Sequence, residues 1–316
     1  MNKSIKIVFL DTATVGNVDN LAEIFMLGEY TGYEITPPGE RIERIQGHNV
    51  VITNKVVIDR DVMDACPELA LVCIVATGMN NIDLDYAAKK GITVKNVAGY
   101  STESVTQCTF ASLFYLMNAG RYYDDYVKSG QYAGSAIFTH LGREFWELSG
   151  KHFGIIGMGT IGRRVAGVAC AFGAKVSYTS TSGKNLNAGG YQHLPLDDLL
   201  RAADVISIHC PLNDRTRNLL TESRLRLMKP TAYLMNMGRG GFVDEAALAR
   251  AIDENRIAGA ALDVLTAEPI AADSPLLKVR NQEKLFITPH IAWASREARR
   301  LLITRTAENI KRHFSI

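Results

Sequence analysis

The feature that most constrains the fold is the alternation of short, β-branched apolar runs with segments of helical pattern. Before residue 100 the runs are IKIVFLD, NVVITNK, ALVCIVATG and ITVKNVAG, and the helical segment NIDLDYAAKKG separates the last two. Strands that are joined through helices pair in parallel, because each crossover returns the chain to the same end of the sheet. We therefore expect an α/β protein built on parallel sheets.

A second series of apolar runs follows: HFGIIGMG, AKVSYTS, DVISIHC, TAYLMNMG, IAGAALDV and KLFITPH. Six strands with crossovers suit a complete dinucleotide-binding domain. Between the two series lies STESVTQCTFASLFYLMNAG, a long helix with Ser101 or Thr102 as candidate cap and Glu103 in its first turn. We expect this helix to link two domains. After residue 290, AWASREARRLLITRTAENIKRHF predicts one more amphipathic helix.

Composition excludes several classes of protein. The chain has 316 residues and is 47% hydrophobic, enough for a large core and two domains. Lys and Arg total 35 against 33 Asp and Glu, so the net charge of +2 disfavours nucleic-acid or acidic-membrane partners. Five scattered cysteines without C-x-x-C spacing predict neither a disulfide framework nor a metal site, and favour a cytoplasmic protein. MNKSIKIVFLD is interpreted as a first strand and not as a secretion signal, and no apolar stretch approaches membrane-spanning length.

Gly157, Gly159 and Gly162 form a G-x-G-x-x-G loop between an apolar strand and the helical segment RRVAGVACAFG. The first glycine permits the turn, the second lets the backbone approach a pyrophosphate, and the third packs the helix on the strand. The N–H groups at the start of the helix then face the phosphates. The strand, turn and helix context favours dinucleotide binding over a turn without a ligand.

The next strand, AKVSYTSTSGKN, lacks the acidic residue that binds the ribose 2′-hydroxyl in NAD-selective sites. Without that carboxylate a 2′-phosphate is not repelled, and Ser180, Thr181, Ser182 and Lys184 offer hydrogen bonds or charge to it. We therefore expect NAD or NADP as cofactor, and hypothesise that NADPH is accepted or preferred. The alternative is a solvated loop that leaves the ribose loosely held and the protein indifferent to the phosphate.

Three later segments, NMGRGGFVDEAAL, ALDVLTAEP and ITPHIAW, each place a polar residue just past a predicted strand. In an open parallel sheet, ligands bind at this carboxyl edge. Arg239 offers a fork of donors for a carboxylate or keto oxygen. His290 can protonate that oxygen as a hydride reaches the carbon, and Glu268 favours the imidazolium. Taken singly, Arg239 also suits a turn, Glu268 a loop cap, and His290 a packed interface position. Together with the glycine loop, the three residues indicate hydride transfer.

At these motifs the chain resembles the D-isomer-specific 2-hydroxyacid dehydrogenase family. The resemblance covers nearly the whole length, through ATGMNNID, NVAGYSTESV, GIIGMGTIG, IHCPLNDRTRNL, NMGRGG, LDV with EP, and TPHIAW. It implies catalytic roles for Arg239 in substrate activation, Glu268 in support of the histidine, and His290 in acid/base catalysis. Glu268 also argues against the formate dehydrogenase branch, which carries glutamine at the matching place.

The resemblance implies further contacts. For the cofactor these are Gly159, Thr160 and Ile161 at the pyrophosphate, His209 and Pro211 near the adenosine, Met237, and Asp263 near the nicotinamide amide. For the substrate carboxylate they are the backbone of Thr77, Gly78 and Met79. A pocket lined by Asn80, Ser104 and Arg239 suits a small polar keto acid, with Trp293 as its wall or as plain core.

The family fold implies a Rossmann dinucleotide-binding domain, residues 102–290, inserted in a flavodoxin-like substrate domain, residues 1–101 and 291–316. The aromatic segment Arg121–Gly150 corresponds to an arm that wraps a second subunit, which predicts a homodimer; a lid folded on its own chain is the alternative. The chain departs from the family at two places. It lacks the acidic residue that binds the ribose, and it has Val105, Thr106, Gln107 and Cys108 where many members have V-A-E-H.

Within the family the sequence is most like the glycerate dehydrogenase or hydroxypyruvate reductase branch. The predicted reaction transfers a hydride between a nicotinamide cofactor and a small 2-hydroxy or 2-keto acid, namely glycerate/hydroxypyruvate or glyoxylate. Two alternatives stay open. One is a nucleotide-sensing, corepressor-like regulatory protein on the same fold, and the other is a dehydrogenase of bulkier 2-keto acids.

Overall fold

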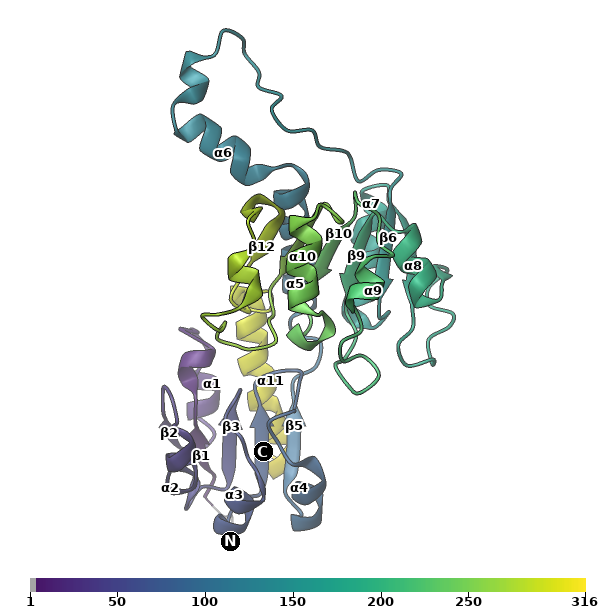
Figure 1. Ribbon diagram of the computed structural model, residues 1–316. Helices are drawn as coiled ribbons and strands as arrows, with labels where there is room; N and C mark the ends of the chain where they lie inside the picture. The colour runs from purple at the N-terminus through teal and green to yellow at the C-terminus, as the bar shows by residue number, and fades with distance from the viewer. Residues whose placement is uncertain (1–3) are drawn as a thin grey trace. The chain divides into compact units, whose positions relative to one another are not determined.

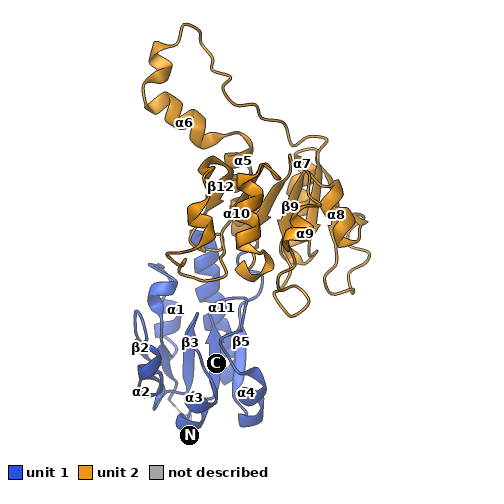
Figure 2. Cartoon of the chain, in the orientation of Figure 1, with its two compact units in different colours: residues 1–101, 294–316 blue, residues 102–293 orange. Residues whose placement is uncertain are grey.

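The computed structural model describes residues 4–316 and forms two compact units (Figure 2). Unit 1 comprises residues 1–101 and 294–316, and unit 2 comprises residues 102–293. The chain therefore returns to unit 1 at Ala294, whereas the sequence placed the return at residue 291. The difference arises because residues 291 and 292 remain hydrogen-bonded to Asp263 of unit 2.

Unit 1 is built on a five-stranded sheet in the order β2-β1-β3-β4-β5 (Figure 1). All neighbouring strands are parallel, and this is the flavodoxin-like order. The strands are β1 (Lys6–Phe9), β2 (Glu29–Gly32), β3 (Val50–Thr53), β4 (Leu71–Ile74) and β5 (Thr93–Asn96). β3 and β4 are buried along their whole length, as expected for strands covered on both faces.

The helices of unit 1 are α1 (Ala22–Phe25), α2 (Arg41–Ile45), α3 (Arg60–Ala65), α4 (Leu84–Lys90) and α11 (Arg296–Phe314), with 3-10 turns η1 (Thr12–Thr14) and η2 (Pro38–Glu40). α11 is the amphipathic helix predicted after residue 290. The Ser295 hydroxyl caps it by accepting a hydrogen bond from Ala298 N at 3.1 Å. α11 packs against α1 and β4, so the last segment of the chain completes the first unit.

Unit 2 is built on a seven-stranded parallel sheet in the order β12-β11-β10-β9-β6-β7-β8. The strands are β6 (His152–Ile156), β7 (Lys175–Thr179), β8 (Gln192–His193), β9 (Val205–Ile208), β10 (Tyr233–Asn236), β11 (Gly259–Leu262) and β12 (Leu285–Ile287). The strand order reverses between β6 and β9, where a doubly wound sheet opens a crevice outside its carboxyl ends. The predicted fold class, two doubly wound parallel-sheet domains, is confirmed.

The helices of unit 2 are α5 (Thr102–Met117), α6 (Gly120–Lys128), α7 (Thr160–Ala171), α8 (Leu196–Ala202), α9 (Glu222–Leu225) and α10 (Glu245–Asp253), with 3-10 turns η3 (Gln131–Gly134), η4 (Gly240–Phe242), η5 (Pro275–Lys278) and η6 (Gln282–Lys284). They cover both faces of the sheet. Alternate strand residues point to opposite faces, so on β9 the side chain of Val205 joins the core beneath α5 and α7, and that of Ile206 joins the core beneath α8 and α10.

All ten predicted strands are present, but β2 and β8 were not predicted. Both lie at sheet edges, and each is partly exposed, so neither carries an apolar run. Their sequences, EYTG and QH, lack the β-branched pattern on which the other predictions depended.

The glycines of α7 give a test of helix–strand packing. A Cβ on Gly162 would lie 2.2 Å from the Gly157 carbonyl oxygen, whereas Gly167 on the same helix has no such neighbour within 4 Å. We expect Gly162→Ala to lower the free energy of unfolding by about 2 kcal/mol, because backbone must move. Gly167→Ala should raise it by up to about 1 kcal/mol through helix propensity. Urea unfolding measures both, and equal stabilities of the two variants would contradict this packing.

Candidate active site

The glycine loop joins β6 to α7 at the point where the strand order reverses. Gly157 has φ +97°, and a Cβ there would lie 2.6 Å from Cys210 Cβ. Gly162 is needed for the close packing of α7 described above. Gly159 differs from both, because a Cβ there would meet no heavy atom within 4 Å. The chain itself requires glycine at 157 and 162, and the open space at 159 fits the approach of a ligand.

The first turn of α7 is open to an anion. Gly159 is its N-cap residue, so no side chain caps the helix, and Thr160, Ile161 and Gly162 begin it without an acidic residue. In addition, residues 148–196 contain no Asp or Glu, although they contain Lys151, Arg163, Arg164, Lys175 and Lys184. Free helix N–H groups and a positive local charge fit the pyrophosphate of a dinucleotide.

The four residues predicted at the ribose follow β7 in one loop. Ser180 and Thr181 are half-buried, and Ser182 and Lys184 are exposed. The Ser180 N–H donates to His193 Nε2 on β8 at 3.4 Å, and the Thr181 hydroxyl hydrogen-bonds to the Cys210 thiol. The loop is therefore anchored at its start and exposed at its end, where Lys184 lies.

Residues predicted near the adenosine and nicotinamide follow β9 and β10. His209 Nε2 lies 2.7 Å from the Ser207 hydroxyl, and burial lowers the pKa of His209 to about 4, so its ring is neutral near pH 7. The His209 N–H donates to Ile156 O at 2.8 Å, which places it beside the glycine loop. Pro211 O accepts from the Thr216 hydroxyl at 2.8 Å, and Met237 is buried directly after β10.

Glu268 and His290 are joined directly. His290 Nδ1 lies 2.7 Å from Glu268 Oε2, and the other carboxylate oxygen, Oε1, accepts from Leu265 N at 2.9 Å. The two residues follow β11 and β12, which are neighbours in the sheet. With Nδ1 donating to the carboxylate, Nε2 is left to exchange a proton with a ligand. His290 has φ +56°, in the left-handed region that few non-glycine residues adopt.

Arg239 lies in the loop after β10, beside these two strands. The Asn236 side chain holds this loop: its Nδ2 donates to Arg239 O at 2.8 Å and its Oδ1 accepts from Gly238 N at 3.1 Å. A Cβ on Gly240 would lie 1.9 Å from Leu265 C. Glycine at 240 therefore lets the Arg239 loop lie against the loop that leads to Glu268. Within the described residues, the structure records no hydrogen bond from Arg239 to Glu268 or His290.

Asp263 and Ser104, predicted at the cofactor and the substrate, are both buried and engaged within unit 2. The Asp263 carboxylate accepts hydrogen bonds from Thr288, Ile291 and Ala292, and burial raises its pKa. The Ser104 hydroxyl donates to Ala292 O at 2.6 Å. The structure thus shows both side chains on the segment that carries His290.

The residues predicted at the substrate carboxylate, Thr77, Gly78 and Met79, together with Asn80, follow β4 in unit 1, whereas Arg239, Glu268 and His290 lie in unit 2. Asn96 Nδ2 donates to Thr77 O at 2.6 Å, and the Thr77 hydroxyl donates to Val97 O at 3.3 Å. The loop is therefore tied to the end of β5. Its contact with a substrate stays a prediction.

Sequence reasoning missed the residues that hold these loops. They are Asn236 and Gly240 for the Arg239 loop, Glu245, whose Oε1 accepts from Thr266 N at 2.6 Å, and Thr288. A signal existed for three of them, since Asn236 and Gly240 lie inside the NMGRGG motif and Thr288 begins the TPHIAW motif. The role of Glu245 was not marked, because its partner Thr266 is distant in the chain.

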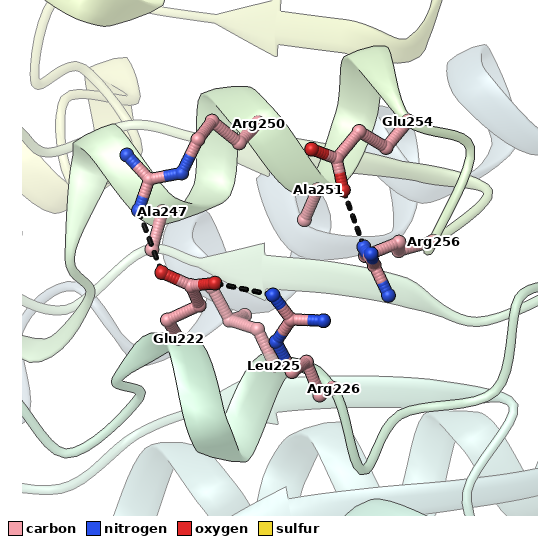
Figure 3. Close-up of a pocket in the computed structure, with 8 residues that line it drawn as sticks. All are labelled: Glu222, Leu225, Arg226, Ala247, Arg250, Ala251, Glu254 and Arg256. Carbon is pink, nitrogen blue, oxygen red and sulfur yellow. Dashed lines mark hydrogen bonds and ion pairs between the residues drawn. The ribbon is translucent and has the colours of Figure 1, made fainter.

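Away from these loops, the described residues form a small pocket and no cluster of metal ligands. The pocket between α9 and α10 is lined by Glu222, Leu225, Arg226, Ala247, Arg250, Ala251, Glu254 and Arg256 (Figure 3). Glu222 pairs with Arg226 and Arg250, and the volume of about 10 Å³ holds about one water. Over residues 4–316, no three His, Cys, Asp or Glu side chains gather to hold a metal ion. No helix of that range is long and apolar enough to cross a membrane.

Comparison with known proteins gives consistent matches. The family model for the NAD binding domain of D-isomer specific 2-hydroxyacid dehydrogenases matches residues 110–292. Hydroxypyruvate reductase of Blautia hydrogenotrophica is 35% identical over 90% of this chain and 89% of its own length. Glycerate dehydrogenase of Methylorubrum extorquens is 34% identical over 97% of this chain and 95% of its own length.

Among solved structures, an acyclic imino acid reductase in complex with NADPH and D-Arg is 31% identical, with a TM-score of 0.88 over 98% of this chain and 97% of that one. The resemblance drawn from the motifs is thereby confirmed. With a matched cofactor domain and relatives that align along nearly its full length, the chain belongs to the D-isomer specific 2-hydroxyacid dehydrogenase family.

Proposed function

We propose that the protein is an NAD(P)-dependent oxidoreductase that transfers a hydride between the nicotinamide and a small 2-hydroxy or 2-keto acid, glycerate/hydroxypyruvate or glyoxylate. The observation that carries this proposal is the 2.7 Å pair of His290 Nδ1 and Glu268 Oε2 at the carboxyl edge of the dinucleotide-binding sheet. The curated relatives named hydroxypyruvate reductase and glycerate dehydrogenase support the choice of acid.

Each side chain has a defined part in this reaction. When bound, the nicotinamide supplies or accepts the hydride. In the direction of reduction, His290 Nε2 donates a proton to the keto oxygen as negative charge develops there. Glu268 stabilises the imidazolium and holds the ring orientation through Nδ1. Arg239 binds the carboxylate or the keto oxygen through its guanidinium fork. In the oxidative direction, His290 accepts the proton of the hydroxyl.

The cofactor of choice is proposed to be NADPH. The loop after β7 contains Ser180, Thr181, Ser182 and Lys184 where an NAD-selective protein has an acid, and no Asp or Glu occurs from residue 148 to 196. A 2′-phosphate would therefore meet hydroxyl donors and positive charge, with no carboxylate close in sequence to repel it.

The protein is proposed to act as a homodimer through the arm of residues 121–150. Figure 1 shows α6 and the loop after it extending away from the rest of unit 2. Phe138 and Leu141 on this arm are 89% and 82% exposed, and Ile137 and Phe145 are also exposed. A cluster of exposed large apolar side chains on one segment is typical of an interface. A cytoplasmic location stays a prediction from the five cysteines, which form no disulfide.

Turnover tests the proposed reaction. We expect loss of reduced-nicotinamide absorbance with hydroxypyruvate or glyoxylate, faster than with a bulky 2-keto acid. His290→Ala should lower kcat/KM at least about 100-fold, because acid/base catalysis alone contributes about that much. Arg239→Met should lower it by a similar factor, because the donors that bind the acid are lost. Arg217→Met, an exposed arginine in another loop of unit 2, is the matched control and should keep activity.

Preference for a bulky acid would favour the alternative dehydrogenase. Absence of turnover with all acids, combined with NAD(H)-dependent capture of a partner protein, would favour the corepressor-like alternative.

The cofactor preference is tested by fluorescence titration with NADPH and NADH. We expect tighter binding of NADPH, and we expect Ser180→Asp to weaken NADPH at least about 10-fold, because a carboxylate would face the 2′-phosphate. Ser180→Asn introduces a side chain of the same shape as aspartate without its charge, and this variant should keep the preference for NADPH. Tighter binding of NADH by the unmodified protein would refute the NADPH proposal.

The oligomeric state is tested by sedimentation or light scattering. We expect a mass of twice the 34.7 kDa chain. Phe138→Asp combined with Leu141→Asp should give monomers, because two charges would be buried without partners. Met26→Asp, at an 85% exposed apolar residue of unit 1, should leave the dimer intact. A monomeric mass for the unmodified chain would exclude the dimer.

A further inference from the structure

We propose that Ser104, Asp263 and Thr288 form a clamp that positions His290 for proton transfer. The clamp acts on residues 288–292, the segment between β12 and the end of unit 2. This inference rests on the proposed dehydrogenase function. The structure records no hydrogen bond between the His290 ring and any of the three side chains, all of which it describes. Their recorded hydrogen bonds hold residues 288–292, so we assign them as positioning residues.

Asp263 is the centre of the clamp. Its Oδ1 accepts from the Thr288 hydroxyl at 2.6 Å and from Ile291 N at 2.8 Å, and its Oδ2 accepts from Ala292 N at 2.8 Å. Its own carbonyl oxygen accepts from His290 N at 2.8 Å. The residue is 2% exposed. Hydrogen bonds to a buried carboxylate are among the stronger ones in proteins, so one residue holds the chain on both sides of His290.

His290 needs such support because of its backbone conformation. Its φ of +56° is unfavourable for a residue with a side chain. Residues in sparsely populated backbone conformations persist only where the surrounding structure determines them. Here Thr288 is held before the histidine, and Ile291 and Ala292 are held after it. The clamp therefore keeps the histidine in the left-handed conformation that directs its ring to Glu268.

Ser104 holds the same segment through the carbonyl oxygen of Ala292. Its hydroxyl is buried and donates to Ala292 O at 2.6 Å, while Ala292 N donates to Asp263. Both backbone groups of Ala292 are thus engaged. α5, which carries Ser104, packs against β10, β11 and β12. One helical turn further along α5, the pKa of Cys108 is raised by burial and by the charge of Asp263, which shows that the same face of α5 lies near the clamp.

Glu268 has an anchor outside residues 288–292. Its Oε1 accepts a hydrogen bond from Leu265 N, in the loop after β11. Loss of a clamp bond would therefore shift His290 relative to this anchor. Proton transfer is sensitive to displacements of about 1 Å, which cost on the order of 100-fold in rate. Binding of the acid by other groups would be affected much less.

The kinetic test compares Ser104→Ala and Thr288→Val with Ser112→Ala. Ser112 is a buried serine further along α5, and the structure records no hydrogen bond from it to residues 288–292. We expect both clamp variants to lower kcat for hydroxypyruvate by roughly 10-fold to 100-fold, with KM changed less than about two-fold. Ser112→Ala should keep kcat. A raised KM with unchanged kcat for Ser104→Ala would instead assign Ser104 to the substrate and overturn the clamp.

A second readout is independent of turnover. Amide hydrogen exchange of Ile291 and Ala292 is measured by NMR or mass spectrometry on the full-length protein without cofactor. We expect Ser104→Ala and Thr288→Val to speed exchange at these two amides at least about 10-fold, and Ser112→Ala to leave it unchanged. Unchanged exchange in the clamp variants would overturn the clamp. If the clamp variants exchange faster but the unmodified protein reduces no keto acid, the hold of the clamp on the segment is supported and the proposed function is rejected.

Discussion

The hydrogen bond between His290 Nδ1 and Glu268 Oε2 is the interaction on which the proposed chemistry depends, and it exists only because two adjacent parallel strands end at the same edge. β11 and β12 deliver residues that are 22 positions apart in the sequence to within 2.7 Å. β10 adds Arg239 one strand further along. The right-handed crossovers of a parallel sheet make this convergence automatic, since every strand exits in the same direction. The loops then have only to set local orientation.

Glycines divide between two tasks in this unit. Gly157, Gly162 and Gly240 are needed by the chain itself, because added atoms would enter neighbouring backbone or the Cys210 side chain. A Cβ on Gly159 would meet no heavy atom within 4 Å, so the chain itself does not require glycine there. The same distinction separates residues that hold loops from residues that are proposed to react. Asn236 and Asp263 use their polar atoms on backbone, whereas His290 Nε2 and most of the Arg239 fork have no recorded partner among residues 4–316.

Much of this arrangement was predictable from sequence, and the exceptions share a physical cause. Apolar runs predicted all strands that are covered on both faces, but β2 and β8 lie at edges and carry no such run. The glycine spacing, Arg239, Glu268 and His290 were recognisable because each lies in a short motif after a strand. The hydrogen bond of Ser104 was not, since its partner Ala292 is 188 residues away. Resemblance placed Ser104 at the substrate, and only the fold shows its hydroxyl on the histidine segment.

The support for His290 also explains why its segment stays with unit 2 up to Trp293. A histidine that left the sheet freely after β12 would have its ring orientation set by a flexible loop. Instead, Asp263, directly after β11, accepts hydrogen bonds from Ile291 and Ala292, and Ser104 in the first turn of α5 donates to Ala292. The chain crosses between units only at residues 101–102 and 293–294, directly outside these anchors. The segment that bears His290, the proposed proton-transfer group, is therefore fixed to the sheet of unit 2 before the chain leaves it.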